Sequence, residues 1–190
     1  MFYPVLRIEI ADYLLRFIAK QDIAIARHSW NVKSIAVNLA HNLDLSAEVS
    51  QELSTAALLH DIGKLIIPRR ILHKPGKLTE AEFEIIKEHS PNGFHFLKAI
   101  SQLEHIAEAV LYHHEKFDGS GYPEGRAGED IPLISRILTI ADVYEATTAD
   151  RVYRKAMTRE MALAILYDGR GTQFDPSMVD IFLKNIVDDD

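Results

Sequence analysis

Cysteine is absent from this chain of 190 residues. Disulfides and thiolate metal sites are therefore excluded, and the cytoplasm, a reducing compartment, is the natural setting for the protein. Basic charge is in deficit as well, because 21 lysines and arginines face 28 aspartates and glutamates, for a formal net charge of −7. Long nucleic acids are bound by neutralising their phosphates, so this balance argues against them as partners. A small anionic ligand held by a local cluster of groups remains allowed.

A long apolar run is also missing. The first 20 residues are rich in Leu, Ile and Phe, but charged side chains interrupt them every few positions: Arg7, Glu9, Asp12, Arg16 and Lys20. A membrane span needs about 20 apolar residues and a signal peptide needs an unbroken apolar centre, so we expect neither. We expect an amphipathic lead-in helix over residues 1–25, followed by one domain over residues 26–190.

Apolar residues are plentiful, at 47% of the chain, and they recur at helical spacing. Examples are Leu14, Leu15 and Ile18, then Ile35, Leu39 and Leu43, then Leu53, Ala57 and Leu58. Strand-like alternation over five or more residues is scarce. The sequence therefore predicts an all-α fold.

Capping and proline signals mark several expected helix starts, at Ser46, Thr79, Pro132 and Asp175-Pro176. Two stretches break the helical pattern, residues 68–78 and residues 118–131. The second holds four glycines and directly follows a histidine pair. Irregular loops of this length in a compact domain are usually functional or disordered, and the position next to the histidines favours function.

His60 and Asp61 follow an apolar helix and precede Gly63 and Lys64. Successive side chains on a helix diverge by about 100°, so His60 and Asp61 could grip different metals or different sides of one. On the same helix, Lys64 comes back to the face of His60, about 40° from it. Imidazole with carboxylate suits Zn, Fe or Mn. A helix that merely ends in polar residues is an equally good interpretation of these residues alone.

Asp142 lies inside the apolar run Ile137 to Val143, where an unpaired carboxylate would be costly. A metal ligand resolves this cost, and a buried salt bridge to Arg136 or Arg151 is the alternative. The adjacent His113 and His114 are a weak signal by themselves, as are His28 and His89. The remaining histidines have no partner at metal-ligand spacing and are interpreted as ordinary polar residues: His41, His73, His95 and His105.

Together these residues resemble a known family, the HD-GYP domain of the HD phosphohydrolase superfamily. The matching segments are HDIGK at 60–64, His89, HHEKFDGSGYP at 113–123, and Asp142 with DRVYR at 150–154. They occur in the family's order and span roughly residues 26–187. The eleven-residue string is highly specific. The resemblance implies an HD-type helical bundle with a dinuclear metal site in its core.

The resemblance also implies residue roles. The residues that match the family's metal ligands are His28, His60, Asp61, His89, His113, His114 and Asp142. Asp61 would bridge the metals, and Asp61 and Lys64 are the expected catalytic residues. The expected substrate-binding residues are Lys64, which contacts a phosphate, Tyr122 of the Gly-Tyr-Pro loop, and Arg151 and Arg154, which hold phosphates.

Two positions depart from the family pattern. Ala24 stands where three-metal members carry a glutamate, and a methyl group cannot bind a cation. We therefore expect two divalent ions, with Fe or Mn favoured and Zn or Ni also compatible with these ligands. Val152 stands where the family often has proline, which should affect only backbone stiffness.

The expected activity is hydrolysis of cyclic di-GMP to pGpG, with GMP as a further expected product. One alternative is a catalytically weak module that binds a cyclic dinucleotide or a protein. Another is an HD hydrolase acting on a nucleotide or on a related cyclic dinucleotide, although His89 and the His113–His114 pair exceed what a simple HD site needs. A regulatory protein bound at the Gly-Tyr-Pro loop and a homodimer formed through the N-terminal helix are further expectations.

Overall fold

The structure, a computed structural model, describes residues 3–150 and 155–187. Over these ranges it contains helices, two isolated β-bridges and no β-strand, so the all-α prediction is confirmed. The elements in chain order are α1 (Tyr3–Gln21), α2 (Ile23–Asn42), α3 (Ala47–Leu59), η1 (Ile62–Ile66), α4 (Arg69–Leu72), α5 (Glu80–Lys87), α6 (His89–Lys98), α7 (Glu104–Leu111), η2 (Gly128–Asp130), α8 (Leu133–Thr148), α9 (Arg159–Asp168) and α10 (Pro176–Val187).

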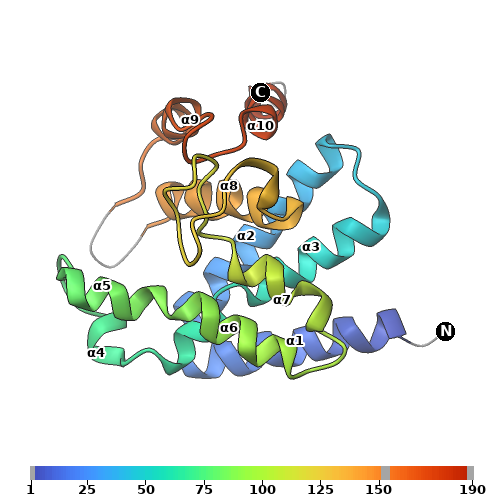
Figure 1. Cartoon of the computed structure of the whole chain (residues 1–190), viewed down its shortest axis with the longest axis vertical. Coiled ribbons are helices and arrows are strands. Elements are labelled where there is room, and N and C mark those ends of the chain that lie inside the picture. Colours follow the sequence, from blue (N-terminus) through green and yellow to red (C-terminus); the bar gives the residue numbers. More distant parts are fainter. Residues whose placement is uncertain (1–2, 151–154, 188–190) are drawn as a thin grey trace.

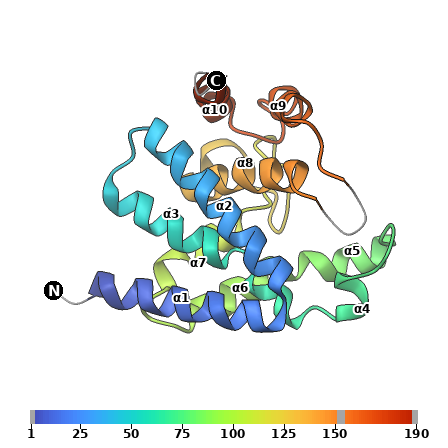
Figure 2. The same ribbon diagram turned by 180° about the vertical axis from the view of Figure 1, so that it is seen from behind.

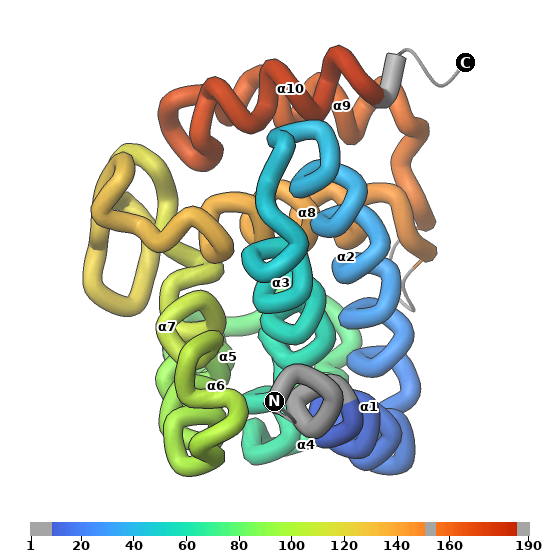
Figure 3. The backbone as a smooth tube through the Cα atoms, turned by 90° about the vertical axis from the view of Figure 1, so that its right-hand side faces the viewer, coloured from blue at the N-terminus to red at the C-terminus, as the bar shows by residue number. Residues whose placement is uncertain are grey.

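The helices are arranged along one long axis. α9 and α10 lie at one end of it, next to α8, and α1 lies at the other end (Figures 1 and 2). α2 and α3 run between the two ends (Figure 3). α2 packs against both α3 and α8. On α2 the fully buried Val32, Ala36 and Leu39 follow the predicted helical spacing. This central trio of helices forms the core on which the candidate site is built.

The predicted helix starts are confirmed. Ser46 caps α3 by accepting a hydrogen bond from the backbone N–H of Val49. Thr79 and Glu82 form a reciprocal capping box at α5. α8 follows Pro132, and α10 begins at Pro176. Residues 68–78 are not wholly irregular, because α4 occupies four of them.

α1 packs against α2, α3 and η1. Its buried residues Ala11, Leu14 and Ile18 recur at three- and four-residue intervals, as in an amphipathic helix. Asp22 then caps α2 through hydrogen bonds from the backbone N–H groups of Ala24 and Ile25. A domain boundary at residue 25 stays a prediction. None of the described helices is long and apolar enough to cross a membrane.

Asp175 links the start of α10 to α8 through hydrogen bonds. Its carboxylate accepts hydrogen bonds from the backbone N–H and hydroxyl of Ser177, at 2.9 and 2.6 Å, and from Arg136 Nη1 at 2.7 Å. Burial works against ionisation of this carboxyl, but the hydrogen bonds from Ser177 and Arg136 outweigh it and lower its pKa. Arg136 is therefore engaged by Asp175, rather than by Asp142 as one sequence interpretation proposed.

We expect Asp175→Ala to lower the free energy of unfolding by about 2–3 kcal/mol, because it removes a helix cap and leaves Arg136 without its partner. Since the folded pKa is depressed, this contribution is complete above the ordinary pKa of 3.8 and is lost as the pH falls below it. Urea unfolding of the parent and the variant at neutral pH measures the loss of unfolding free energy. The same measurement near pH 3 should give a smaller difference between them. Asp180→Asn, which breaks an exposed pair with Arg170, is the control and should cost less than about 1 kcal/mol. Equal losses in the two variants would contradict the assignment.

Candidate metal centre

His60 and Asp61 lie where the buried helix α3 stops. α3 ends at Leu59, and residues 62–66 continue as the 3-10 helix η1. His60 and Asp61 are each only 1% exposed. The expectation that Lys64 returns to the face of His60 on a continuing α-helix is wrong. A 3-10 helix aligns residues i and i+3, so Lys64 stands beside Asp61 instead, with 2.6 Å between Nζ and Oδ2.

Gly63 allows this tight turn to lie against the start of α6. A Cβ atom at position 63 would lie 2.0 Å from the carbonyl oxygen of His89 and 2.7 Å from the amide nitrogen of Gly93. No side chain fits in that space. The glycine of the His-Asp motif therefore sets the distance between Asp61 and His89.

All seven predicted metal ligands converge on one centre. They come from α2, the end of α3, the start of α6, the end of α7 and α8. Their ligand atoms form three overlapping groups, each within 4.8 Å: His28, His60 and Asp142; His60, Asp61 and His113; and His89, His113 and His114. Segments that are far apart in the sequence thus present their nitrogen and oxygen atoms to the same small volume.

The cluster has two halves, one formed by His28, His60 and Asp142 and the other by His89, His113 and His114. Asp61 lies between them. Its Oδ2 is 3.6 Å from His28 Nε2 and 3.4 Å from His60 Nε2, while its Oδ1 is 3.6 Å from His89 Nε2. In one half, His28 Nε2 lies 3.0 Å from Asp142 Oδ1. In the other half, His89 Nε2 lies 3.1 Å from His114 Nε2. A carboxylate with one oxygen facing each half is the geometry of a bridging ligand.

Three of the histidines are oriented by the same local contact. The Nδ1 atoms of His60, His89 and His113 lie 2.8, 2.7 and 2.6 Å from the backbone carbonyl oxygens three residues earlier. A carbonyl can only accept, so each Nδ1 carries the proton and each Nε2 keeps a free lone pair that points into the cluster. These three imidazoles thus present acceptor nitrogens to the cluster.

The donor set fits metal cations. Among the described residues, His60 Nε2 and Asp61 Oδ1 are buried without a hydrogen-bond partner, which is costly unless a cation satisfies them. Burial lowers the pKa of His89 to about 4 and of His114 to about 3, and it also lowers the pKa of His60 and His113. These imidazoles are therefore neutral and able to bind a metal at physiological pH.

The carboxylates of the cluster are ionised. Burial opposes the charge on Asp61, but the nearby ammonium of Lys64 outweighs it and holds the pKa well below the ordinary value. Burial likewise opposes the charge on Asp142, and the hydrogen bond from His28 outweighs it and lowers the pKa. His28 differs from the other histidines, because its hydrogen bonds to Asp142 and Glu145 outweigh burial and raise its pKa to about 9. A cation at Nε2 would replace that proton.

Glu145 and Asn31 are parts of the centre that sequence reasoning missed. Glu145, 5% exposed, lies one turn after Asp142 on α8. Its Oε2 accepts a hydrogen bond from His28 Nδ1 at 2.5 Å, and its Oε1 accepts one from Asn31 Nδ2 at 3.0 Å. The available signal was the three-residue spacing from each partner to a ligand: His28 to Asn31, and Asp142 to Glu145.

The Gly-Tyr-Pro loop lies against the same cluster. The backbone N–H of Tyr122 donates to the carbonyl of His114, and the Tyr122 ring lies over the His114 ring, with 4.9 Å between centroids and a 32° tilt. Gly121 is required because a Cβ there would lie 2.5 Å from the Cα of Glu115. The loop therefore closes over one side of the histidines.

Glu115 holds this loop in place, a role that sequence reasoning did not assign. Its side chain is buried, and its Oε1 accepts hydrogen bonds from the backbone N–H groups of Glu124 and Gly125, at 2.7 and 3.0 Å. Arg151 and Arg154, expected to hold phosphates, lie outside the described residues. Their placement stays a prediction.

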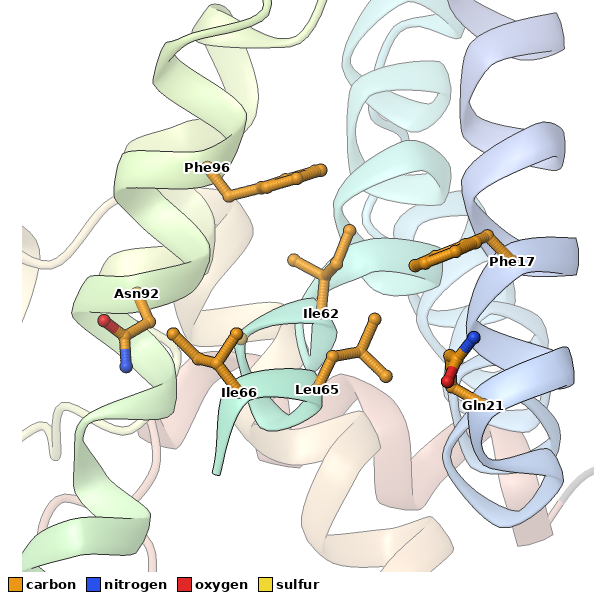
Figure 4. A pocket seen from close by; sticks show the side chains of 8 residues that line it. Phe17, Gln21, Ile62, Leu65, Ile66, Asn92 and Phe96 are labelled. Atoms are coloured by element: carbon orange, nitrogen blue, oxygen red, sulfur yellow. The ribbon is translucent and has the colours of Figure 1, made fainter. Parts of the chain in front are cut away.

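Two hollows lie near the centre. One, of about 190 Å³, opens beside His28, Asp61 and Lys64, and its rim includes His73, which pairs with Asp22 at 2.8 Å. A larger hollow of about 340 Å³ lies between α1, η1 and α6, with side chains such as Phe17, Ile62 and Phe96 turned toward it (Figure 4). The second is apolar and contains none of the ligand atoms. The first is therefore the entrance to the candidate centre.

Fold and site together define an all-helical protein with a core cluster of histidines and aspartates suited to divalent cations. The chain belongs to the HD domain family, which matches residues 4–178. The resemblance of the chain to the HD-GYP branch is confirmed by the similar proteins described next.

The cyclic di-GMP phosphodiesterase response regulator RpfG of Xanthomonas campestris pv. campestris is 42% identical over 179 residues, which cover 93% of this chain and 47% of that protein. The chain thus spans about half the length of this relative. Among solved structures, Bd1817, an HDG"Y"P protein of Bdellovibrio bacteriovorus, has a TM-score of 0.72 at 16% identity, over 97% of this chain and 63% of that one. The HD domain of the Listeria monocytogenes phosphodiesterase PgpH, in complex with cyclic di-AMP, has a TM-score of 0.68 at 19% identity, over 93% and 94%. The HD-type helical fold is confirmed by these likenesses.

Proposed function

We propose that this chain is a metal-dependent phosphodiesterase that hydrolyses cyclic di-GMP to linear pGpG and then to GMP. The convergence of seven ligand side chains, with Asp61 between two groups, is the observation that carries this proposal. The relative RpfG, named as a cyclic di-GMP phosphodiesterase, supports the substrate class. The cytoplasmic setting expected from the absence of cysteine is part of the proposal.

We propose two divalent ions, Fe or Mn. His28, His60 and Asp142, from α2, the end of α3 and α8, would hold one of them, and His89, His113 and His114 would hold the other. When bound, such a pair supplies Lewis acidity for phosphoryl transfer and stabilises negative charge on oxygen. Asp61 fits the bridging role because its two oxygens face the two groups.

The chain's own residues would then orient and stabilise the substrate. Lys64 Nζ, beside Asp61 at the entrance, would donate to a non-bridging oxygen of the phosphate and stabilise the charge that builds up there. Tyr122 would cover the substrate on the side of His114, and Arg151 and Arg154 would hold the second phosphate. One water molecule adds to phosphorus and the ribose 3′ oxygen leaves with a proton, which opens the ring.

The experiment is a turnover assay on protein purified without oxygen and loaded with Mn²⁺ or Fe²⁺. Mass spectrometry should detect pGpG first and GMP later. Binding of cyclic di-GMP without turnover by the metal-loaded protein would contradict the enzymatic proposal and favour a binding module.

Glu145 is expected to strengthen metal binding by fixing His28. Glu145→Ala removes the acceptor at His28 Nδ1, so we expect metal affinity at that half of the centre to fall about 10- to 100-fold. Glu145→Gln keeps one acceptor oxygen and should lie closer to the parent. Calorimetric titration of each protein with Mn²⁺ measures the metal affinity directly. An unchanged affinity in Glu145→Ala would remove the positioning role.

We further propose two protein contacts. The Gly-Tyr-Pro loop would bind a regulatory protein. A homodimer would form through α1, whose Tyr13 and Phe17 are 70% and 45% exposed, with Phe17 also lining the apolar hollow of Figure 4. Sedimentation of the parent and of Tyr13→Glu tests the dimer, which the substitution should dissociate.

A further inference from the structure

One face of α5 stands beside the Gly-Tyr-Pro loop, at the edge of the candidate centre. The Phe83 ring meets Tyr122 edge-on, with 6.4 Å between centroids, and Lys87 Nζ lies 5.1 Å from the Phe83 ring and 5.5 Å from the Tyr122 ring. Tyr122 in turn covers His114. A residue on this face is therefore separated from the metal ligands by a single aromatic ring.

The same face carries a charged pair. Lys87 Nζ donates to Glu84 Oε1 at 2.6 Å. The Glu84 side chain is 60% exposed and that of Lys87 is 29% exposed, so both are open to a ligand. Phe83 is 43% exposed and offers a free ring surface.

The carboxylate of Glu84 and the ammonium of Lys87 match the hydrogen-bonding edge of guanine and not that of adenine. Guanine presents the acceptor O6 next to the donors N1–H and N2–H₂, whereas adenine presents the donor N6–H₂ next to an acceptor. A carboxylate can accept from N1–H and N2–H₂ while a neighbouring ammonium donates to O6. Against adenine, the ammonium would face a donor and the carboxylate an acceptor. An exposed aromatic ring stacks on either base.

We propose that Glu84, Lys87 and Phe83 form a guanine-recognition corner that binds one base of the cyclic dinucleotide while its phosphodiester lies at the metal centre. This inference rests on the proposed function and specifies its substrate class. The corner selects ligands with at least one guanine. A cyclic dinucleotide with one guanine and one adenine would bind in a single orientation, so that one of its two phosphodiester bonds is opened in preference to the other.

The test uses the metal-loaded protein with cyclic di-GMP, the 3′,3′-linked cyclic GMP–AMP and cyclic di-AMP. The parent should favour the two guanine-containing ligands. Glu84→Gln and Lys87→Met should each lower kcat/KM for cyclic di-GMP about 10-fold, mainly through KM, because each weakens a charged hydrogen bond. Activity on cyclic di-AMP should change less than about 2-fold, because that ligand never makes those bonds. The mixed ligand should yield one linear product with the parent and both isomers with the variants.

Lys98→Met is the matched control, since Lys98 also lies over an aromatic ring, that of Phe94, but not over Tyr122. It should leave all rates and products unchanged. Binding of the same three ligands is measured by calorimetry, so the affinity ratios test the corner whether or not turnover occurs. An equal loss on all three ligands, an unchanged ratio, or a parent preference for cyclic di-AMP would overturn the corner. Absence of turnover with guanine-selective binding would overturn the proposed hydrolysis alone.

Discussion

Asp61→Asn should lower kcat/KM for cyclic di-GMP by at least about 10³-fold, the largest effect on activity that we expect from a single substitution. The carboxylate of Asp61 offers one oxygen to each half of the cluster. An amide offers only one oxygen, because its nitrogen has no lone pair free for a cation. The substitution also removes the charge that pairs with Lys64. The variant should therefore lose both the bridge and the anchor of the lysine.

Metal analysis separates this explanation from misfolding. Asp61→Asn should retain the helical circular dichroism of the parent but bind fewer metal ions per chain, since each half keeps its histidines and loses the shared ligand. Asp180→Asn is the control, because Asp180 lies on α10 in an exposed pair with Arg170. It should match the parent in both measurements. Turnover by Asp61→Asn within about 10-fold of the parent would contradict a bridging role, since loss of a shared catalytic group costs far more.

Part of the ligand set stands out in the sequence against its surroundings, whereas His28, His89, His113 and His114 were predicted as ligands only through the family resemblance. Asp142 is a carboxylate in an apolar helix, and His60 and Asp61 end another apolar helix, so burial without a partner would be costly at each position. The order of the motifs then supported the family resemblance. All seven side chains lie together, as predicted, whereas their role as metal ligands stays a proposal.

The partners of these ligands could not be predicted in the same way. Whether Glu145 meets His28 depends on the rotation of α8 relative to α2, which packing of the whole core decides. The contact of Phe83 with Tyr122 depends similarly on how the loop folds back over His114. A glutamate or phenylalanine on an amphipathic helix carries no signal of its own, because such residues are common there.

The position of Lys64 shows how a local rule is overridden. An α-helix through residues 60–64 is compatible with the sequence, and it would place Lys64 near His60. In the structure, Gly63 lies close to the start of α6, and residues 62–66 form a 3-10 helix instead. Lys64 therefore pairs with the carboxylate of Asp61.

Gly63→Ala should have the largest effect on stability, lowering the free energy of unfolding by about 3 kcal/mol or more. The added methyl would lie 2.0 Å from the His89 carbonyl oxygen and 2.7 Å from the Gly93 nitrogen, and both are backbone atoms that no rotamer change can move. Either η1 or the start of α6 must therefore shift. Because η1 follows Asp61 and α6 begins at His89, metal affinity should fall together with stability.

Gly93→Ala is the graded control at the same interface. Its added methyl would meet a side-chain methyl of Val110 at 3.0 Å rather than a backbone atom, so a shift of a few tenths of an ångström relieves the contact. We expect a loss of about 1 kcal/mol, at the lower end of the cost of overpacking a core. Urea unfolding of the two variants without metal, followed by Mn²⁺ titration, measures both quantities. If Gly63→Ala loses no more stability than Gly93→Ala, or binds Mn²⁺ as tightly as the parent, then the contact between η1 and α6 does not set the geometry of the metal centre.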